Sequence, residues 1–514
     1  MPDVKLQAPI HLALTPLAWS LAMSLLVLAP GAWAQDAGAR RFSVSPSLSV
    51  SQTFTDNHRV ESTNIERSEA ITTVGAGLRM AVRGARVRGA FDYSLTGLMY
   101  ARDSQANDLQ NRLQATLQSE LVERHVFVDA QASITQQPIS ALARQTPDGF
   151  TSTRNRTEVS TLRLQPRLQG RLAGEVDVQA ALSLAATDTG GAQDTTDSVD
   201  TGASLSLAGG AGRVGWSLLA SRQIVDFKQG RQTENDLVTL QLSVRPDVDW
   251  ALRARGGVEA NDYRRADGKD RYDNFGAGVT WSPSPRTSVS LDGDKRSFGH
   301  SHTVALQHRS RRTVLRYTDS QGVTDGAGDT AQSLVGAYDL FFDLLSSQEP
   351  DPVLREQLVN DLLQRNNLDR ESQIALGFLT SAVTLQRRQE LSVAVQGQRT
   401  SVLASVFGND SSRVDTVSSA VDDTAGGSRV RQRGLSLAVN HRVTPTGSAS
   451  LATSVVRGSE LGGLRTDLRT VSATWSDRLG ARTSYSLSLR HSEYDADADP
   501  YTENALIANL SLRF

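Results

Sequence analysis

From Arg41 onward the chain alternates apolar and polar residues in segments of about ten residues, each followed by a turn. Such segments contain Val74 to Val82, Leu162 to Leu168, Val176 to Leu184 and Val238 to Val244. Successive side chains of a strand point to opposite faces, so these runs predict a sheet with one apolar and one polar face. A soluble sandwich and a membrane barrel share this pattern, and the connections must distinguish them.

Short connections alternate with longer polar loops. The short connections are expected at 83–85, 122–124, 170–174, 209–212, 247–249, 283–286, 309–311, 387–389, 444–447 and 478–481, and the long loops at 55–68, 137–156, 187–198, 262–270, 408–429 and 495–502. Outer-membrane barrels have short periplasmic turns and longer outer loops. The sequence therefore predicts an all-β chain, a transmembrane antiparallel up-and-down β-barrel of about 22 strands within a range of roughly 20 to 24, in the Gram-negative outer membrane.

The last segment of the chain alternates up to its final residue. Leu506, Leu510, Leu512 and Phe514 share one face of the expected last strand. A final strand that ends on an aromatic residue resembles the signal by which the barrel assembly machinery recognises its clients. We therefore assign Leu510, Leu512 and Phe514 to an assembly signal, and expect that machinery, outer-membrane lipid and lipopolysaccharide as partners.

The first 34 residues are expected to be a signal peptide. Lys5 precedes an apolar stretch from Leu12 to Ala29, and Ala32 and Ala34 form a small-x-small cleavage site. Residues 35–514 would then form the barrel. An uncleaved anchor helix is the alternative.

Composition excludes several functions. The chain has no cysteine, which removes disulfides, thiolate metal sites and cysteine nucleophiles. Its formal net charge of -2 leaves no basic surplus for a nucleic-acid partner. A Ser nucleophile elbow, an HExxH helix and a phosphate-cradling loop are all missing from the sequence, so we expect neither an enzyme nor a cofactor.

Residues 319–372 break the strand pattern, and we expect a helical insertion there with a helical hairpin near 331–366. Leu334, Tyr338, Phe341, Phe342 and Leu345 have helical spacing. A second helix is expected to begin at Pro352, capped by Asp351, with an apolar stripe that includes Leu354 and Leu358. The turn pattern puts this hairpin in a loop on the outer side. It either packs into the barrel mouth, or gates the lumen or docks a partner.

Several short motifs resemble the PEP-CTERM system-associated outer-membrane β-barrel family. They are Phe54-Thr55-Asp56-Asn57, Phe91-Asp92-Tyr93-Ser94, His308-Arg309-Ser310-Arg311-Arg312, Pro350-Asp351-Pro352-Val353-Leu354-Arg355 and Phe378-Leu379-Thr380-Ser381. The resemblance covers nearly all of the expected mature chain. It implies a setting of exosortase sorting and exopolysaccharide production, with exopolysaccharide and its export components as partners, and assigns no catalytic residue.

Arginine supplies almost all of the positive charge after the signal segment. Five arginines alternate with the apolar face: Arg79, Arg163, Arg167, Arg253 and Arg255. A charge on the lipid side costs about 2 to 4 kcal/mol at the bilayer midplane, so we expect these side chains to line the lumen. Arginine forks would suit an acidic glycan, although a bias of the genome toward Arg over Lys explains the composition equally. Pro166 should produce a bulge in its strand.

Two groups could hold a metal ion. His300 and His302 have the i, i+2 spacing of half a zinc site, but exposed rim histidines fit as well. Asp495, Asp497 and Asp499 resemble the first ligands of a calcium loop, although the turn glycine and the final acid are missing. We therefore expect a solvated acidic loop and no metal site.

Three functions remain. The first is a passive or gated outer-membrane conduit for exopolysaccharide or its fragments. The second is a scaffold with a closed lumen, whose outer loops attach polysaccharide or sorted surface proteins. The third, an enzyme with a site borne on loops, has no supporting motif.

Overall fold

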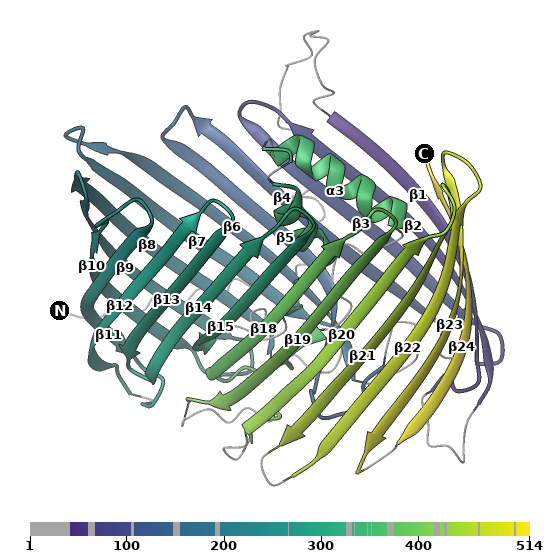
Figure 1. Ribbon diagram of the computed structural model, residues 1–514. Helices are drawn as coiled ribbons and strands as arrows, with labels where there is room; N and C mark the ends of the chain where they lie inside the picture. The colour runs from purple at the N-terminus through teal and green to yellow at the C-terminus, as the bar shows by residue number, and fades with distance from the viewer. Residues whose placement is uncertain are drawn as a thin grey trace.

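The computed structural model is a closed antiparallel β-barrel of 22 strands, and Figure 1 shows the strands inclined to the barrel axis. It describes residues 42–514 except 60–66, 104–106, 147–154, 191–195, 266, 325–331, 334, 347, 351, 367–374, 416–421, 426–428, 461–462 and 498–499. The expected fold class and the central strand number are confirmed. The expected signal peptide, with Ala32 and Ala34, lies outside the described residues.

Each strand pairs with its neighbours in the chain, and β1 pairs with β24 to close the barrel. The strands are β1 (Phe42–Thr55), β2 (Glu69–Arg83), β3 (Val87–Tyr100), β4 (Asp108–Val122), β5 (Val126–Pro138), β6 (Arg156–Leu172), β7 (Val176–Thr189), β8 (Ser198–Ala211), β9 (Val214–Phe227), β10 (Thr233–Val244), β11 (Trp250–Asn261), β12 (Asp270–Ser284), β13 (Thr287–Arg296), β14 (Gly299–Arg309), β15 (Thr313–Thr324), β18 (Thr384–Gln396), β19 (Thr400–Arg413), β20 (Arg429–Arg442), β21 (Ser448–Glu460), β22 (Arg465–Arg478), β23 (Thr483–Ala496) and β24 (Tyr501–Arg513).

Short turns join the strands at one end of the barrel, the short-turn end, and longer connections join most of them at the other, the loop end, where β13 and β14 are joined by only two residues. The expected turn at 387–389 is wrong, because these residues lie inside β18, and the turn falls at 397–399 instead. The polar run Arg387-Arg388-Gln389 has the composition of a turn. In the fold its charges are paired: Arg387 donates across strands to Asp319 of β15, and Arg388 donates to Glu390 on β18 itself.

The apolar side chains of the strands point outward. Leu162, Leu168 and Leu182 are exposed on this face, which in a membrane is the lipid side. The expected bulge at Pro166 is wrong. The pairing of β6 with β7 skips Gln165 and Pro166 but resumes in the same register, so only ladder hydrogen bonds are lost.

One insertion between β15 and β18 contains the helices, as expected. It comprises β16 (Gln332–Ser333), α2 (Ala337–Leu345), α3 (Pro352–Asn366) and β17 (Ala375–Leu376), and β16 pairs with β17. The expected boundaries of 319 and 372 differ from those observed, because β15 continues to Thr324 and β18 begins at Thr384. Leu334 and the expected cap Asp351 lie outside the described residues.

In the described part of the chain, neither helix is long and apolar enough to cross a membrane. The closed sheet pairs every strand with a neighbour on each side, and much of its lateral surface is apolar. A barrel with these properties, short turns at one end and longer loops at the other is an outer-membrane protein whose short-turn end faces the periplasm.

Candidate functional site

The insertion between β15 and β18 folds back into the barrel from the loop end and reaches the short-turn end. Its middle part is held to the interior wall by the Val335 amide, which donates to Glu390 Oε1 at 2.9 Å. Farther along, Arg309, the last residue of β14 before a short turn, donates to the Asp343 carbonyl at 3.3 Å. The hairpin therefore begins in an outer loop, as expected, but lies inside the lumen.

Helix α2 packs against the interior wall through its apolar face. Leu340, Phe341 and Leu344 are buried in one cluster with Val314 of β15 and Ala394 of β18. Figure 1 shows α2 within the outline of the barrel, beside these strands. Burying a Leu or Phe side chain contributes about 1.5–3 kcal/mol, so this face is the main attachment of the insertion.

Polar contacts supplement this attachment at few points. Arg316 of β15 forms an ion pair with Asp343 of α2. Partly exposed pairs of this kind contribute about 1 kcal/mol or less. The attachment thus depends mainly on apolar packing.

Helix α3 extends from α2 toward the other side of the barrel. Val359 and Leu363 pack against α2, whereas Leu354 and Leu358 are exposed. Glu356 approaches Arg83, the last residue of β2, at 3.7 Å. Figure 1 shows α3 at the same end of the barrel as the C-terminus. The two helices therefore span the periplasmic end of the lumen from the β15–β18 wall to the β2 wall.

A second set of contacts, the loop cap, lies at the loop end. Ala141 and Leu142 of the β5–β6 connection pack against Phe378 and against Val430 of β20. The Leu379 amide donates to the Ile139 carbonyl at 3.2 Å. Connections from distant strands therefore meet across the loop end of the barrel.

The Asp423 carboxylate holds this cap, accepting a hydrogen bond from the Ala141 amide at 2.6 Å. Burial raises the pKa of Asp423, and Asp422 raises it further, although Ser140 and Ala141 oppose the shift. Asp422 itself pairs with Arg413. Because burial places the folded pKa above the unfolded value, the folded cap has its full stability below the unfolded pKa and loses stability as pH rises through the folded pKa, when the buried carboxylate becomes charged.

We therefore expect the conductance of the native protein to rise as the pH increases above the ordinary Asp pKa of about 4. Asp423→Asn keeps an oxygen acceptor for the Ala141 amide but carries no charge, so it should lose most of that rise. Planar-bilayer conductance at several pH values measures the effect. An unchanged pH profile in the variant would rule out Asp423 as its source.

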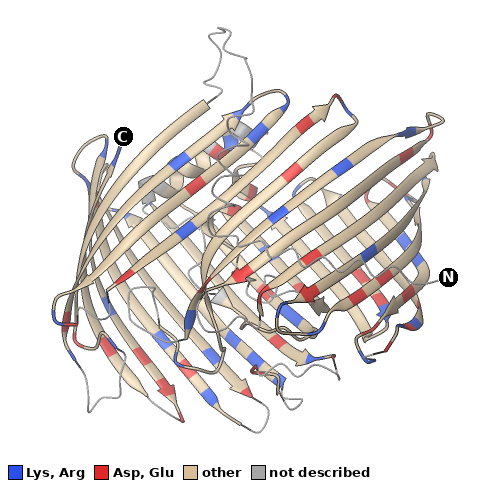
Figure 2. Cartoon of the chain, turned by 180° about the vertical axis from the view of Figure 1, so that it is seen from behind, with Lys and Arg blue, Asp and Glu red and all other residues tan. Residues whose placement is uncertain are grey.

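The register puts the five arginines expected in the lumen on the face opposite the exposed leucines. Four of them have carboxylate partners: Arg79 with Asp92 at 2.5 Å, Arg167 with Asp129 at 3.0 Å, Arg253 with Asp292 at 2.8 Å and Arg255 with Asp294 at 2.9 Å. Among the described residues, Arg163 has no such partner. Figure 2 shows charges of both signs interspersed along the strands. Carboxylates thus neutralise most of these arginines, which weakens the case for an acidic glycan as the cargo.

Arg163→Gln should therefore shift ion selectivity toward cations. In water, a unit charge about 8 Å from the permeating ion changes the electrostatic energy of that ion by roughly 0.5 kcal/mol, which corresponds to about a twofold change in the permeability ratio. The matched control Arg253→Gln with Asp292→Asn removes a whole ion pair and should leave selectivity unchanged. Reversal potentials in a salt gradient measure both, and equal shifts in the two variants would contradict this account.

The sequence analysis did not identify a wall of hydroxyl groups on the interior face of β19–β24. Hydroxyl pairs lie close together there: Ser405 and Ser436 at 2.6 Å, Thr474 and Ser488 at 2.8 Å, Ser484 and Ser511 at 2.7 Å, and Ser448 and Ser476 at 2.9 Å. The sequence contains a pattern that predicts this wall, because these serines and threonines alternate with the outward leucines of the same strands. We refer to this surface as the hydroxyl wall.

The two candidate metal groups are not assembled into sites. His302 contacts Asp319 at 3.1 Å, and its register neighbours show that it faces outward. Asp497 accepts a hydrogen bond from the Arg465 amide, and Asp499 is outside the described residues. No group of three or more potential metal ligands occurs in the part of the chain that the structure describes.

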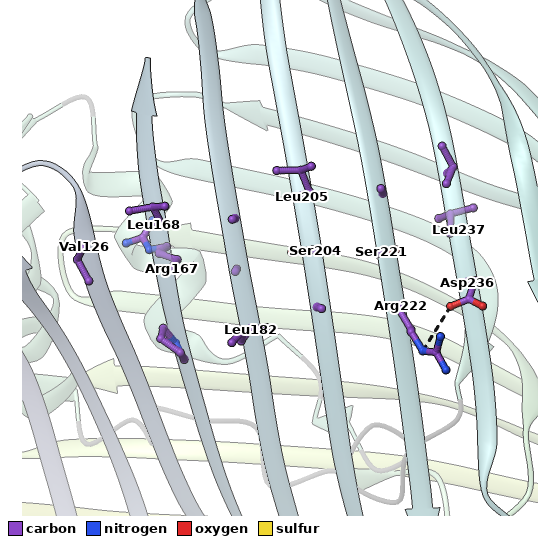
Figure 3. A pocket seen from close by; sticks show the side chains of 16 residues that line it. Val126, Arg167, Leu168, Leu182, Ser204, Leu205, Ser221, Arg222, Asp236 and Leu237 are labelled. Atoms are coloured by element: carbon purple, nitrogen blue, oxygen red, sulfur yellow. Dashed lines mark ion pairs between the residues drawn. The ribbon is translucent and has the colours of Figure 1, made fainter. Parts of the chain in front are cut away.

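A shallow hollow crosses the wall over β5–β10, where small side chains such as Ala181, Ser204 and Ser221 thin the surface. Figure 3 shows Arg222 and Asp236 joined as an ion pair beside it. Most of its lining residues face outward, including Leu182 and Leu205, so the hollow belongs to the lipid side rather than to the lumen.

The residues of the expected assembly signal end β24, which closes the barrel against β1. Leu510 and Leu512 pair with Val50 and Leu48, and the Phe514 amide donates to the Pro46 carbonyl at 3.0 Å. The Phe514 side chain is 57% exposed. It therefore contributes little packing to the folded barrel.

The chain matches no protein-family model and no curated protein sequence. Its fold is similar to solved outer-membrane proteins. The FrpB iron transporter of Neisseria meningitidis is 9% identical, with a TM-score of 0.48 over 93% of this chain and 82% of that chain. The outer membrane protein OpdK of Pseudomonas aeruginosa is 10% identical, with a TM-score of 0.33 over 92% of this chain and 99% of that chain. These likenesses concern architecture alone.

Proposed function

We propose that the chain is a gated outer-membrane conduit for exopolysaccharide, in which the insertion opens and closes the lumen, and that it has no catalytic activity. The observation that carries the gate is the position of α2 and α3, which span the periplasmic end of the lumen. Their attachment includes one apolar cluster, the partly exposed ion pairs Arg316–Asp343 and Arg83–Glu356, and the Val335 amide on Glu390. An element held in this way can move without unfolding the barrel.

The chemistry of the interior supports a neutral or weakly charged polymer as cargo. Sugars present hydroxyl groups that donate and accept hydrogen bonds, and the hydroxyl wall presents the same groups. The arginines of the opposite wall are mostly neutralised by carboxylates. Barrels of 16 to 18 strands already hold aqueous channels, so a 22-stranded barrel has room for a chain of sugars once the insertion moves.

A scaffold with a permanently closed lumen is the second candidate. It is favoured by the loop cap, which closes the loop end with buried contacts such as Phe378 against Leu142. In this case the insertion would be a structural filler, and the outer loops would hold polysaccharide at the surface.

The test is a clean deletion in the native host, with polysaccharide measured separately in the periplasm and outside the cell. The conduit predicts polymer trapped in the periplasm. Normal export, with polymer shed instead of retained at the surface, would reject the conduit and favour the scaffold.

A further inference from the structure

Six arginines form a cluster on the outward face of three neighbouring strands near their loop ends. They are Arg429, Arg431 and Arg433 of β20, Arg457 of β21, and Arg465 and Arg469 of β22. Arg433 pairs in register with Arg457, and two residues on, Leu435 pairs with Val455. Since Leu435 is exposed on the lipid side, the cluster lies on that side and not in the lumen.

The cluster lies at the upper edge of the apolar band. Along the outward face of β20, arginine changes to apolar residues between Arg433 and Leu435, and the apolar residues continue through Leu437 to Val439, before His441. The stretch from Arg433 to His441 is about eight residues, which at ~3.3 Å per residue and a tilt of about 40° rises roughly 20 Å. That rise is close to the usual height of the apolar band, about 25 Å, which puts Arg433 at the headgroups of the outer leaflet.

Part of the positive charge of the cluster is not compensated. Asp410 forms ion pairs with Arg429 and Arg431. Asp467 forms ion pairs with Arg457 and Arg469, and Arg469 also forms an ion pair with Glu493. The side chains of Arg433 and Arg465 are exposed, and neither has a carboxylate within ion-pair distance among the described residues. The guanidinium groups of Arg433 and Arg465 are therefore available to an anion, although the Asp497 carboxylate lies beside Arg465 and accepts from its backbone amide.

This arrangement is local to one side of the barrel. At the same end of β1, β3 and β4 the outward face carries the exposed apolar residues Phe54, Met99 and Leu109. On β9 and β10 the outward Arg222 is matched by Glu234. A general attraction to the membrane surface would not require such a concentration of arginine.

We propose that the arginine cluster binds the phosphate groups of a phosphorylated glycolipid in the outer leaflet. Guanidinium forks bind phosphate through paired charge-assisted hydrogen bonds, and the leucines below the cluster accommodate acyl chains. At this depth on the lateral wall a lipid is the immediate neighbour. The site is independent of the conduit.

The test measures binding of diphosphorylated lipid A to the purified full chain in detergent, by native mass spectrometry at increasing lipid concentration. Arg433→Gln with Arg465→Gln should weaken binding by about tenfold or more. The matched control Arg222→Gln with Arg271→Gln removes two arginines from the outward face of β9 and β12 and should change it less than about twofold. Heat-dependent migration in gels confirms that each variant forms a barrel.

Four results would overturn the proposal. Equal weakening in both double variants would indicate general charge attraction. Unchanged lipid binding in the cluster variant would exclude the site. Competition by inorganic phosphate at the concentration at which lipid A binds would show an anion site without lipid recognition. If a surface protein binds the native chain but not the cluster variant while lipid A binding is unchanged, the cluster is a protein interface.

Discussion

Phe341→Ala with Leu344→Ala should open the barrel to ions and raise its conductance severalfold or more. Both side chains are buried where α2 meets the wall. Leu→Ala and Phe→Ala changes in a core cost about 2–5 and 3–5 kcal/mol, which exceeds the contribution of the few polar contacts of the insertion. The helices should therefore leave the wall, while the strands keep their pairing.

The matched control is Leu354→Ala with Leu358→Ala on α3. These leucines are exposed, so their removal should leave the conductance near the native value. Deletion of residues 335–376, closed by a Gly-Ser linker, gives a second route to the open barrel. Bilayer recordings measure all three proteins. A native-like conductance in both the packing variant and the deletion would show that the insertion does not obstruct the lumen.

Deletion of Phe514 should remove most of the protein from the outer membrane. Only the amide of this residue bonds to the barrel, at the Pro46 carbonyl, and its ring is largely exposed. The loss would therefore reflect failed assembly rather than an unstable fold. Phe514→Tyr keeps an aromatic ring and should assemble normally.

Two measurements separate these causes: the amount of barrel in isolated outer membranes, and the thermal stability of the small fraction that assembles. We expect a large fall in the first and little change in the second. A normal amount of assembled barrel without Phe514 would exclude the terminal residue as the assembly signal.

The strands of this barrel were predictable because they depend on local alternation. Each outward run, such as Leu506 to Leu512, lies on one face whatever its partner strand is. The helices were predictable for the same reason, since Phe341, Phe342 and Leu345 follow a local period. The one misplaced turn arose where charged residues of β18 pair with residues distant in sequence.

The path of the insertion was not predictable from the sequence. Its direction depends on contacts such as Arg316 with Asp343 and Arg83 with Glu356, which no local pattern encodes. The charge balance of the lumen depends in the same way on pairs such as Arg253 with Asp292, contributed by β11 and β13.

The arginine cluster was overlooked for a different reason. Arginines were expected on the lumen side because of the cost of a charge at the bilayer midplane. Their outward direction could be predicted from the sequence, because every second residue of a strand points to the same face. By this alternation, the outward positions of β20 are Arg429, Arg431, Arg433, Leu435 and Leu437. The energetic cost of a charge at the bilayer midplane does not apply to an arginine at the depth of the lipid headgroups.

The most direct test of the gate is to tether it reversibly. The native chain has no cysteine, so Arg316→Cys with Asp343→Cys introduces the only two thiols. A short bis-methanethiosulfonate reagent would join α2 to the wall of β15, and a reductant would release it. We predict that cross-linking abolishes conductance and polymer passage and that reduction restores both. Equal conductance with the tether intact and reduced would contradict a gate formed by the insertion.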